Sequence, residues 1–226
     1  MAESDAEEGT VVLAREQTSG RGTKGRGWHS AKDLGLYLSV ILKPRNPRLT
    51  LLPLAAGLAV SAAIFKACGV VTVLKWPNDI YVRGKKLGGI LIEAVSLGKR
   101  VNYAILGIGL NVKQKKEDFP VDLRNKAVSL AMITGKCLDA EELLNTLLDE
   151  VGRFYGAFHA GKNAEIIRSF TDRMSYPFGK ILSLLTDAGP RTGAFAGLDD
   201  GGGLLLDQNG RRAVYYSGEI IGLQAD

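Results

Sequence analysis

A short segment of glycines and cations, residues 20–28, holds the residues of this chain best suited to bind a phosphate-bearing ligand. It reads Gly-Arg-Gly-Thr-Lys-Gly-Arg-Gly-Trp. Glycines allow backbone N–H groups to converge on an anion, and Arg21, Lys24 and Arg26 add charge-assisted donors at the same place. Trp28 adds a flat apolar face on which a planar group can stack. The segment predicts a loop that closes over an anionic ligand, with a flexible, solvated basic loop as the alternative interpretation.

Two common phosphate-binding motifs do not explain this loop. Gly20, Gly22 and Gly25 satisfy the pattern G-x-G-x-x-G, but that fingerprint requires a helix to begin at its last glycine. Here Gly27 follows almost at once and a strand-like run begins by Leu34, which leaves no room for a helix. No Gly-Lys-Ser or Gly-Lys-Thr follows at the spacing of a Walker motif. A nicotinamide or P-loop enzyme is therefore not expected.

Three further segments combine predicted strands with polar or small residues. Residues 75–79 (Lys-Trp-Pro-Asn-Asp) end a strand, where functional groups are often presented. Residues 85–93 begin with two lysines, and Gly88 and Gly89 leave room for a ligand to approach the backbone. Residues 107–111 (Gly-Ile-Gly-Leu-Asn) form a glycine-rich strand that ends in an amide. Strand glycines usually mark bulges and paired lysines usually solvate hairpins, but the three segments and the basic loop together favour one functional site.

The overall composition is that of a soluble globular chain. The chain has 226 residues, is 46% hydrophobic and carries a formal charge of +5, with acids spread throughout, so charge does not indicate nucleic-acid binding. Cys68 and Cys137 are too few for a disulfide framework or a zinc cluster, and His29 and His159 lack ligand spacing. Residues 1–9 carry four acids and no apolar core, unlike a signal peptide. These features predict a cytoplasmic location.

Residues 1–175 are expected to form an α+β catalytic domain with a mixed, largely antiparallel sheet. The apolar run at 51–65 contains Pro53 and is shorter than the ~20 residues that span a bilayer, so we expect a core helix ended by Gly69. The other predicted elements are strands at 11–14, 34–42, 70–76, 79–82, 87–95 and 101–112, a hairpin turn at Arg83-Gly84, a helix from a capping box at Asp139 towards His159, and a helix at 163–173.

Residues 176–226 are expected to form a separate, small β-barrel. Short strand-like runs at 180–185, 192–197, 203–207 and 212–216 are separated by glycine-rich turns. Such barrels often bind peptides or nucleic acid, and a module that only packs on the larger domain is the alternative.

Taken in order, the motifs resemble those of the biotin–protein ligases. The matching segments are Glu16–Gly22, Lys75–Asp79, Lys85–Gly89 and Gly107–Asn111, and Tyr216–Ile220 is similar to the end of that family's C-terminal domain. The resemblance covers nearly the whole chain and implies a class II synthetase-like catalytic domain followed by an SH3-like barrel. It also implies the activity, in which biotin and ATP form biotinyl-5′-AMP and the biotinyl group passes to one lysine on the carrier domain of a carboxylase.

The resemblance also implies roles for individual residues. Lys86 and Arg21 would be catalytic, with the Lys86 ammonium holding the biotin carboxylate, because two anions must be brought together in the first step. The implied substrates are ATP and biotin, with Mg²⁺ near Asp79, the only obvious acid. The biotin-binding residues would be Gln17, Gly20, Arg21, Gly22, Thr23, Lys86, Gly88 and Gly107, and the adenylate-binding residues Arg26, Trp28, Asn78, Asp79 and Asn111.

Two departures from the family pattern lead to expectations of their own. The family usually has arginine at the position of Thr23, and threonine cannot make a bidentate phosphate contact, so we expect the loop to hold the adenylate less tightly. The sequence also shows no Ser-Thr-Asn segment ahead of its first strand, which in the family walls the biotin pocket. We therefore expect weaker biotin binding than in a relative that has this segment.

Two other functions fit the same residues. A lipoate–protein ligase shares the architecture, but the basic loop followed by Lys-Trp-Pro-Asn-Asp favours biotin, whose ureido ring requires paired hydrogen bonds. A truncated biotin-binding relative with little activity is the second. No helix-turn-helix segment is evident, so DNA is not an expected partner, and neither is a membrane. The expected partners are the carrier domain, the two substrates and, in a homodimer, a second copy of the chain.

Overall fold

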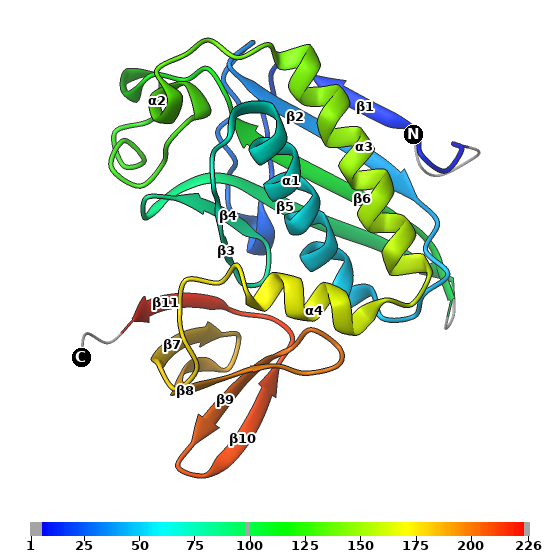
Figure 1. Ribbon diagram of the computed structural model, residues 1–226, viewed down its shortest axis with the longest axis vertical. Helices are drawn as coiled ribbons and strands as arrows, with labels where there is room; N and C mark the ends of the chain where they lie inside the picture. Colours follow the sequence, from blue (N-terminus) through cyan, green and yellow to red (C-terminus); the bar gives the residue numbers. More distant parts are fainter. Residues whose placement is uncertain (1–5, 98–99, 224–226) are drawn as a thin grey trace.

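The computed structural model describes residues 6–97 and 100–223, which form two sheets with helices packed on the larger one (Figure 1). The larger sheet has the strand order β1-β2-β6-β5-β4-β3, and each pair of neighbouring strands is antiparallel. The predicted α+β class is confirmed. Over the described strands this sheet is antiparallel rather than mixed. Its strands are β1 (Val11–Ala14), β2 (Gly35–Leu42), β3 (Val73–Lys75), β4 (Asp79–Val82), β5 (Lys85–Leu97) and β6 (Arg100–Asn111).

Helix α1 (Leu52–Cys68) is the central core helix, as the sequence predicts. Pro53 lies in its first turn, where no N–H is needed, and Gly69 ends it at φ +70°. A 3₁₀ turn precedes α1, so the apolar helical segment extends over Leu49–Cys68. The expectation that this segment is too short to span a bilayer was therefore wrong, because by length and composition alone it could cross a membrane. However, 67% of that window is buried inside the fold.

The other helices complete the layer on the larger sheet. Helix α3 (Ala140–His159) packs beside α1 and over the sheet, and α4 (Asn163–Thr171) lies between α1 and the second sheet (Figure 1). Asp139 caps α3 by accepting hydrogen bonds from two backbone N–H groups, which confirms the predicted start. A short helix, α2 (Leu130–Thr134), begins at a Ser129 cap.

An ion-pair cluster joins α1 to α3. The Glu150 carboxylate, only 2% exposed, accepts Lys66 Nζ at 2.6 Å and Arg153 Nη2 at 2.7 Å. Burial alone raises the pKa of Glu150, but the hydrogen bonds from these two partners outweigh burial and hold the pKa below its usual value.

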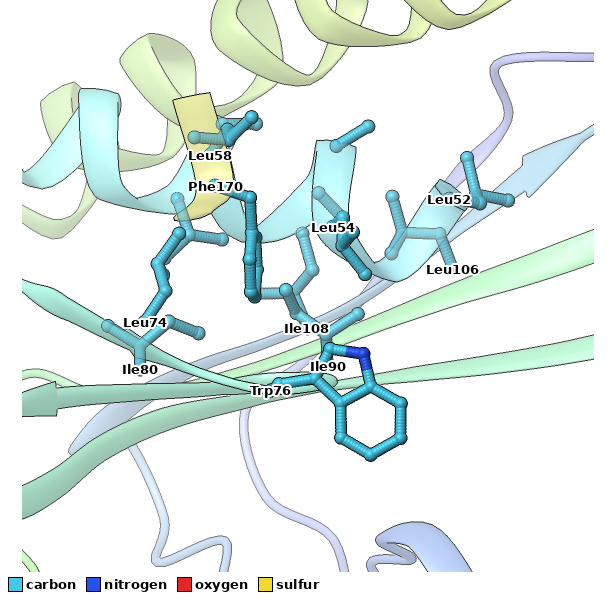
Figure 2. Close-up of a cluster of buried hydrophobic side chains, with 14 of the residues drawn as sticks. Leu52, Leu54, Leu58, Leu74, Trp76, Ile80, Ile90, Leu106, Ile108 and Phe170 are labelled. Atoms are coloured by element: carbon cyan, nitrogen blue, oxygen red, sulfur yellow. The ribbon is translucent and has the colours of Figure 1, made fainter. Parts of the chain in front are cut away.

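The alternation of side chains along the strands separates a core face from a free face. Leu38, Leu106 and Ile108 belong to the buried core, and Figure 2 shows Leu106 and Ile108 beneath α1 together with Phe170 from α4. Each such side chain contributes roughly 1.5–3 kcal/mol when fully buried. Because successive residues point to opposite faces, Ser39 and Gly107, which are paired across β2 and β6, lie on the other face.

The second sheet has the order β10-β9-β8-β7-β11 and is antiparallel. Trp76 ties it to the first part of the chain, because the buried indole N–H donates to the carbonyl of Gly202 at 2.9 Å. Trp76 therefore serves packing, although the sequence placed it among functional groups. The strands are β7 (Ile181–Thr186), β8 (Gly189–Leu198), β9 (Leu204–Gln208), β10 (Arg211–Tyr215) and β11 (Glu219–Leu223).

Candidate active site

A cavity of about 640 Å³ lies where the free face of the larger sheet meets the basic loop. Its walls come from residues 17–29, from β2, β4, β5 and β6, from residues 119–127 and from the start of β11. It brings together all the residues predicted for the site except Gly20 and Gly88. The predicted residues that line it are Gln17, Arg21, Gly22, Thr23, Arg26, Trp28, Asn78, Asp79, Lys86, Gly107 and Asn111.

The basic loop, residues 20–28, is folded back on itself as a flap. The N–H of Gly22 donates to the carbonyl of Arg26 at 2.7 Å, and the N–H of Trp28 donates to the carbonyl of Gly20 at 2.8 Å. A Cβ at position 20 would lie 2.5 Å from the carbonyl oxygen of Trp28. Gly20 is therefore required for the flap to close and does not line the cavity, contrary to its predicted role in biotin binding.

Lys86 lines the cavity next to an acid and to the flap. Its Nζ lies 2.5 Å from Asp79 Oδ1 and 5.6 Å from the ring centroid of Trp28, so the ammonium, the acid and the flap meet as the sequence predicts. The side chain of Lys86 is 30% exposed, which leaves it accessible to a ligand. The site can therefore present a fixed cation to an anionic ligand held under the flap.

A β-bulge aims Lys86 into the cavity. Ile80 pairs with Gly88 whereas Tyr81 pairs with Lys86, so Leu87 is an extra residue on β5. Leu87 is fully buried and Gly88 also faces the core, where a Cβ would lie 2.9 Å from the carbonyl oxygen of Gly109. Two successive residues thus face the core, which turns Lys86 to the free face. Gly88 has a packing role, and Gly89 lines the cavity instead.

Three cations of the site are paired with carboxylates. Lys86 is paired with Asp79, Arg21 lies 3.6 Å from Glu93, and Arg26 Nη1 lies 2.6 Å from Glu219 Oε2. Burial raises the pKa of Glu219, but the hydrogen bond from Arg26 more than offsets it and lowers the pKa. Both arginine pairs are partly exposed and so contribute little stability. An anionic ligand can therefore replace these carboxylates at low cost.

Trp28 packs against two glycines of the sheet, Gly109 and Gly89. A Cβ at Gly109 would lie 2.5 Å from Trp28 Nε1 and Cε2, and a Cβ at Gly89 would lie 3.5 Å from Trp28 Cζ3. The Trp28 Nε1 atom is buried without a hydrogen-bond partner, the only such side-chain atom in the described residues. A ligand acceptor could reach this donor only if the indole moves from Gly109, and it would then satisfy a donor that is costly to leave unpaired.

Asn78 and Asn111 line the cavity, but their amide N–H groups are used within the protein. Asn111 Nδ2 donates to the carbonyl of Val128 at 3.1 Å and its Oδ1 accepts from Gln114, while Asn78 Nδ2 donates to the carbonyl of Ile90 at 2.6 Å. These amides hold the cavity wall with one N–H each, which leaves the second N–H of each Nδ2 and the Oδ1 atom of Asn78 for a ligand.

Comparison with known proteins agrees with this geometry. A profile of the biotin/lipoate A/B protein ligase family matches residues 1–111. The chain is 36% identical to the bifunctional ligase/repressor BirA of Bacillus subtilis, over 97% of this chain and 68% of that protein, and 32% identical to the biotin–[acetyl-CoA-carboxylase] ligase of Paracoccus denitrificans, over 93% and 89%. The chain belongs to the biotin–protein ligase family.

The solved structures extend the match to the whole fold. The biotin protein ligase from Aquifex aeolicus, in complex with biotin and ATP, superposes with a TM-score of 0.86 at 34% identity and covers 99% of this chain and 92% of that one. The class of fold predicted from the sequence is thus that of a biotin–protein ligase.

Several cavity residues of this ligase could not be predicted from the sequence. Glu93 and Glu219 lie inside segments with recognisable motifs, but their pairing with the flap cations Arg21 and Arg26 depends on tertiary contacts. Phe119 and Lys126 come from a loop without any motif, and the backbone of Lys126 accepts a hydrogen bond from the N–H of Lys86 at 2.8 Å. The composition of this loop carried no signal that it walls the site.

The acids of the site fit a cation that is bound mainly by its substrate. The described residues contain no group of three His, Cys, Asp or Glu side chains that could hold a metal by themselves. Mg²⁺ usually keeps several waters and binds through one or two carboxylates and substrate phosphates. Asp79 and Glu219, both at the cavity, suit that mode.

Proposed function

We propose that the cavity holds biotin and ATP side by side and performs both steps of protein biotinylation. The chain is a biotin–protein ligase, supported by its relatives over nearly its whole length. The single observation that supports this proposal is the position of the Lys86 ammonium, 2.5 Å from Asp79 Oδ1 and 5.6 Å from the ring centroid of the flap residue Trp28. In the first step a biotin carboxylate oxygen attacks the α-phosphorus of ATP, and pyrophosphate leaves.

Lys86 offsets the repulsion between the two anions. When biotin binds, its carboxylate replaces Asp79 as the partner of the ammonium, and the charge is then shared with the α-phosphate. In the second step the same ammonium stabilises the oxygen on which charge develops. The neutral amine of a carrier lysine attacks the acyl carbon, the bond from that carbon to the phosphate oxygen breaks, AMP leaves with the electron pair, and the proton lost by the amine passes to water. Arg21 and Arg26, released from Glu93 and Glu219, cover the phosphate from the flap.

The two ends of the cavity suit the two substrates. At one end, a Cβ added to Gly107 would have only Leu91 atoms nearby, at 3.5 Å or more, so the sheet surface there is open to a flat ring. Gln17 also lines the cavity and offers a side-chain amide. Gln17 Oε1 is held by the hydroxyl of Ser30 at 2.6 Å, which orients the amide N–H groups. We assign biotin to this end and the adenine to Trp28, whose free indole N–H can donate to the adenylate.

The finer partners belong to the same proposal. The protein substrate is the biotin carboxyl carrier domain of a carboxylase, as the name of the Paracoccus denitrificans relative implies. Mg²⁺ enters with ATP and is held by the phosphates and by Asp79, Glu219 or both. We further propose that residues 1–175 and 176–226 are the two domains, with Glu219 of the second completing the site of the first.

A homodimer and a cytoplasmic location are also proposed. Edge strand β1 exposes Val11, Val12 and Leu13, a surface that a second copy could cover, and sedimentation velocity would report the dimer. Cys68 and Cys137 are free thiols, which suits a reducing compartment. The lipoate alternative has less support, because the relatives matched over most of their length are biotin ligases.

The test uses the purified chain with labelled biotin, ATP, Mg²⁺ and a carrier domain. We expect biotinyl-AMP without the carrier and a biotinylated carrier lysine with it. Lys86→Met should lower the rate of adenylate formation at least 100-fold, whereas Lys85→Met, next to it on β5 and outside the cavity lining, should stay within twofold. Equal effects of the two substitutions would contradict the role assigned to Lys86. If the wild-type protein formed no product, the remaining interpretation would be a biotin-binding relative with little activity.

A further inference from the structure

We propose that Gln114 is a positioning residue, which fixes the side-chain amide of Asn111 so that the cavity presents an N–H donor to a ring nitrogen of the bound purine. This inference rests on the proposed function, because Asn111 lines the cavity that is assigned there to ATP. Gln114 follows β6, is fully buried and does not line the cavity. Any effect of Gln114 on a ligand is therefore exerted through its neighbours.

Backbone groups at the two ends of a hydrogen-bond chain determine how both amides are oriented. At one end the N–H of Val112, which can only donate, donates to Gln114 Oε1 at 2.8 Å. Gln114 Nε2 therefore faces Asn111 and donates to its Oδ1 at 3.3 Å. At the other end the carbonyl of Val128, which can only accept, accepts from Asn111 Nδ2 at 3.1 Å. A reversal of either amide would bring two donors or two acceptors together.

A buried tyrosine from β2 supports Gln114 from the other side. Gln114 Nε2 donates to the hydroxyl of Tyr37 at 3.2 Å, and this hydroxyl donates to the carbonyl of Ala31 at 3.1 Å. Gly35, which pairs with Asn111 across β2 and β6, makes room for the tyrosine, because a Cβ there would lie 2.5 Å from Tyr37 Oη. Burial raises the pKa of Tyr37 to about 12, so the hydroxyl keeps its proton at neutral pH.

The network leaves one N–H of Asn111 for a ligand. Nδ2 carries two N–H groups, and within the described residues it makes one hydrogen bond, to the carbonyl of Val128. Asn111 is buried but lines the cavity, so the second N–H is a donor that a ligand can reach. The unsubstituted ring nitrogens of adenine are acceptors and suit this donor. Without Gln114, the Asn111 oxygen would lose its partner and the amide could turn.

The test compares Gln114→Met with Thr72→Val. Methionine keeps the length of the side chain but removes both hydrogen-bonding groups, while the N–H of Val112 keeps the carbonyl of Leu34 as a partner at 3.3 Å. Thr72→Val removes a buried hydrogen bond of 2.7 Å to Ser61, and neither of these two residues lines the cavity. Both substitutions remove buried polar contacts, but only the first lies next to the cavity.

We expect Gln114→Met to raise the Kd for ATP about fivefold, because the amide is no longer held. This Kd is measured by calorimetry in the presence of the unreactive alcohol analogue of biotin. The Kd for biotin and the rate of adenylate formation at saturating ATP should stay within twofold. In an Asn111→Ala background, Gln114→Met should have no further effect on ATP binding. Thr72→Val should lower the melting temperature without a change in the Kd for ATP.

Two outcomes would overturn the inference. One is an unchanged Kd for ATP in a folded Gln114→Met protein. The other is an equal effect of Gln114→Met with and without the Asn111 amide, which would show that Gln114 acts on the fold alone. A wild type that binds ATP but forms no product would contradict the proposed function instead, because the role of Gln114 is still measured by binding.

If Gln114→Met does not fold, the orientation of the Asn111 amide is tested with ATP analogues in which one ring nitrogen of adenine is replaced by C–H. At least tenfold weaker binding of one analogue to the wild type, with the difference from ATP abolished in Asn111→Ala, supports an N–H donor at the base. Equal affinities for ATP and for all the analogues refute it.

Discussion

Replacement of Gly109 by alanine should displace Trp28 from the sheet and weaken nucleotide binding. The added Cβ would lie 2.5 Å from Nε1 and Cε2 of the indole, whereas carbon atoms pack best at about 3.5–4.0 Å. The ring must therefore move by roughly 1 Å or more, away from the position in which it flanks the cavity. Because Trp28 belongs to the flap and its N–H is unpaired, the ring can move out at little cost to folding.

The size of the effect follows from the loss of one stacking contact. Stacking of a base on an aromatic side chain is worth about 1–3 kcal/mol, so the KM for ATP should rise roughly 5- to 150-fold. The melting temperature should change by only a few degrees. Tryptophan fluorescence can follow the movement, since the chain has two tryptophans and Trp76 is buried in the core.

Two control experiments test whether the effect of Gly109→Ala acts through Trp28. Gly107→Ala places a methyl group on the same strand and face, but its nearest neighbours are Leu91 atoms at 3.5 Å and beyond, so Trp28 should not move and only the KM for biotin should rise. Gly109→Ala should have no further effect on ATP in a Trp28→Ala background. A KM for ATP within twofold of the wild type in Gly109→Ala, or an undiminished effect when Trp28 is absent, would refute the reasoning.

Three further outcomes are expected. Thr23→Arg should slow the release of biotinyl-AMP in a stopped-flow assay, because the guanidinium can grip the phosphate, and equal release rates would show that the residue at position 23 does not hold the adenylate. Trp76→Phe should lower the free energy of unfolding by about 2 kcal/mol, measured by urea titration, because the buried carbonyl of Gly202 loses its donor. Glu150 stabilises the fold only while ionised and its pKa is lowered, so stability should fall as the pH drops below about 4.5. Glu150→Gln should cost about 1 kcal/mol at pH 7 and flatten this dependence, and an unchanged acid profile would argue against the role of its ion pairs.

The sequence alone determined the family, the class of fold and the segments that supply most of the cavity lining. The reason is local, because the flap and the turn after β3 are short runs whose residue types carry their chemistry. Hydrophobic alternation along β2 and β6 also separates the core face from the free face without knowledge of the partners. The turn at Arg83 and Gly84 was predictable for the same reason, and both residues have positive φ angles, 49° and 74°.

Only the tertiary structure decided which face each β5 residue presents and which acids meet the flap. Strict alternation would place Lys86 and Gly88 on the same face, but the bulge at Leu87 separates them, and a bulge depends on pairing with β4. Likewise, Glu219 lies almost two hundred positions along the chain from Arg26, so no local pattern could reveal their contact. Residue type therefore sets what the side chains can do, while strand register and long-range packing set which of them meet.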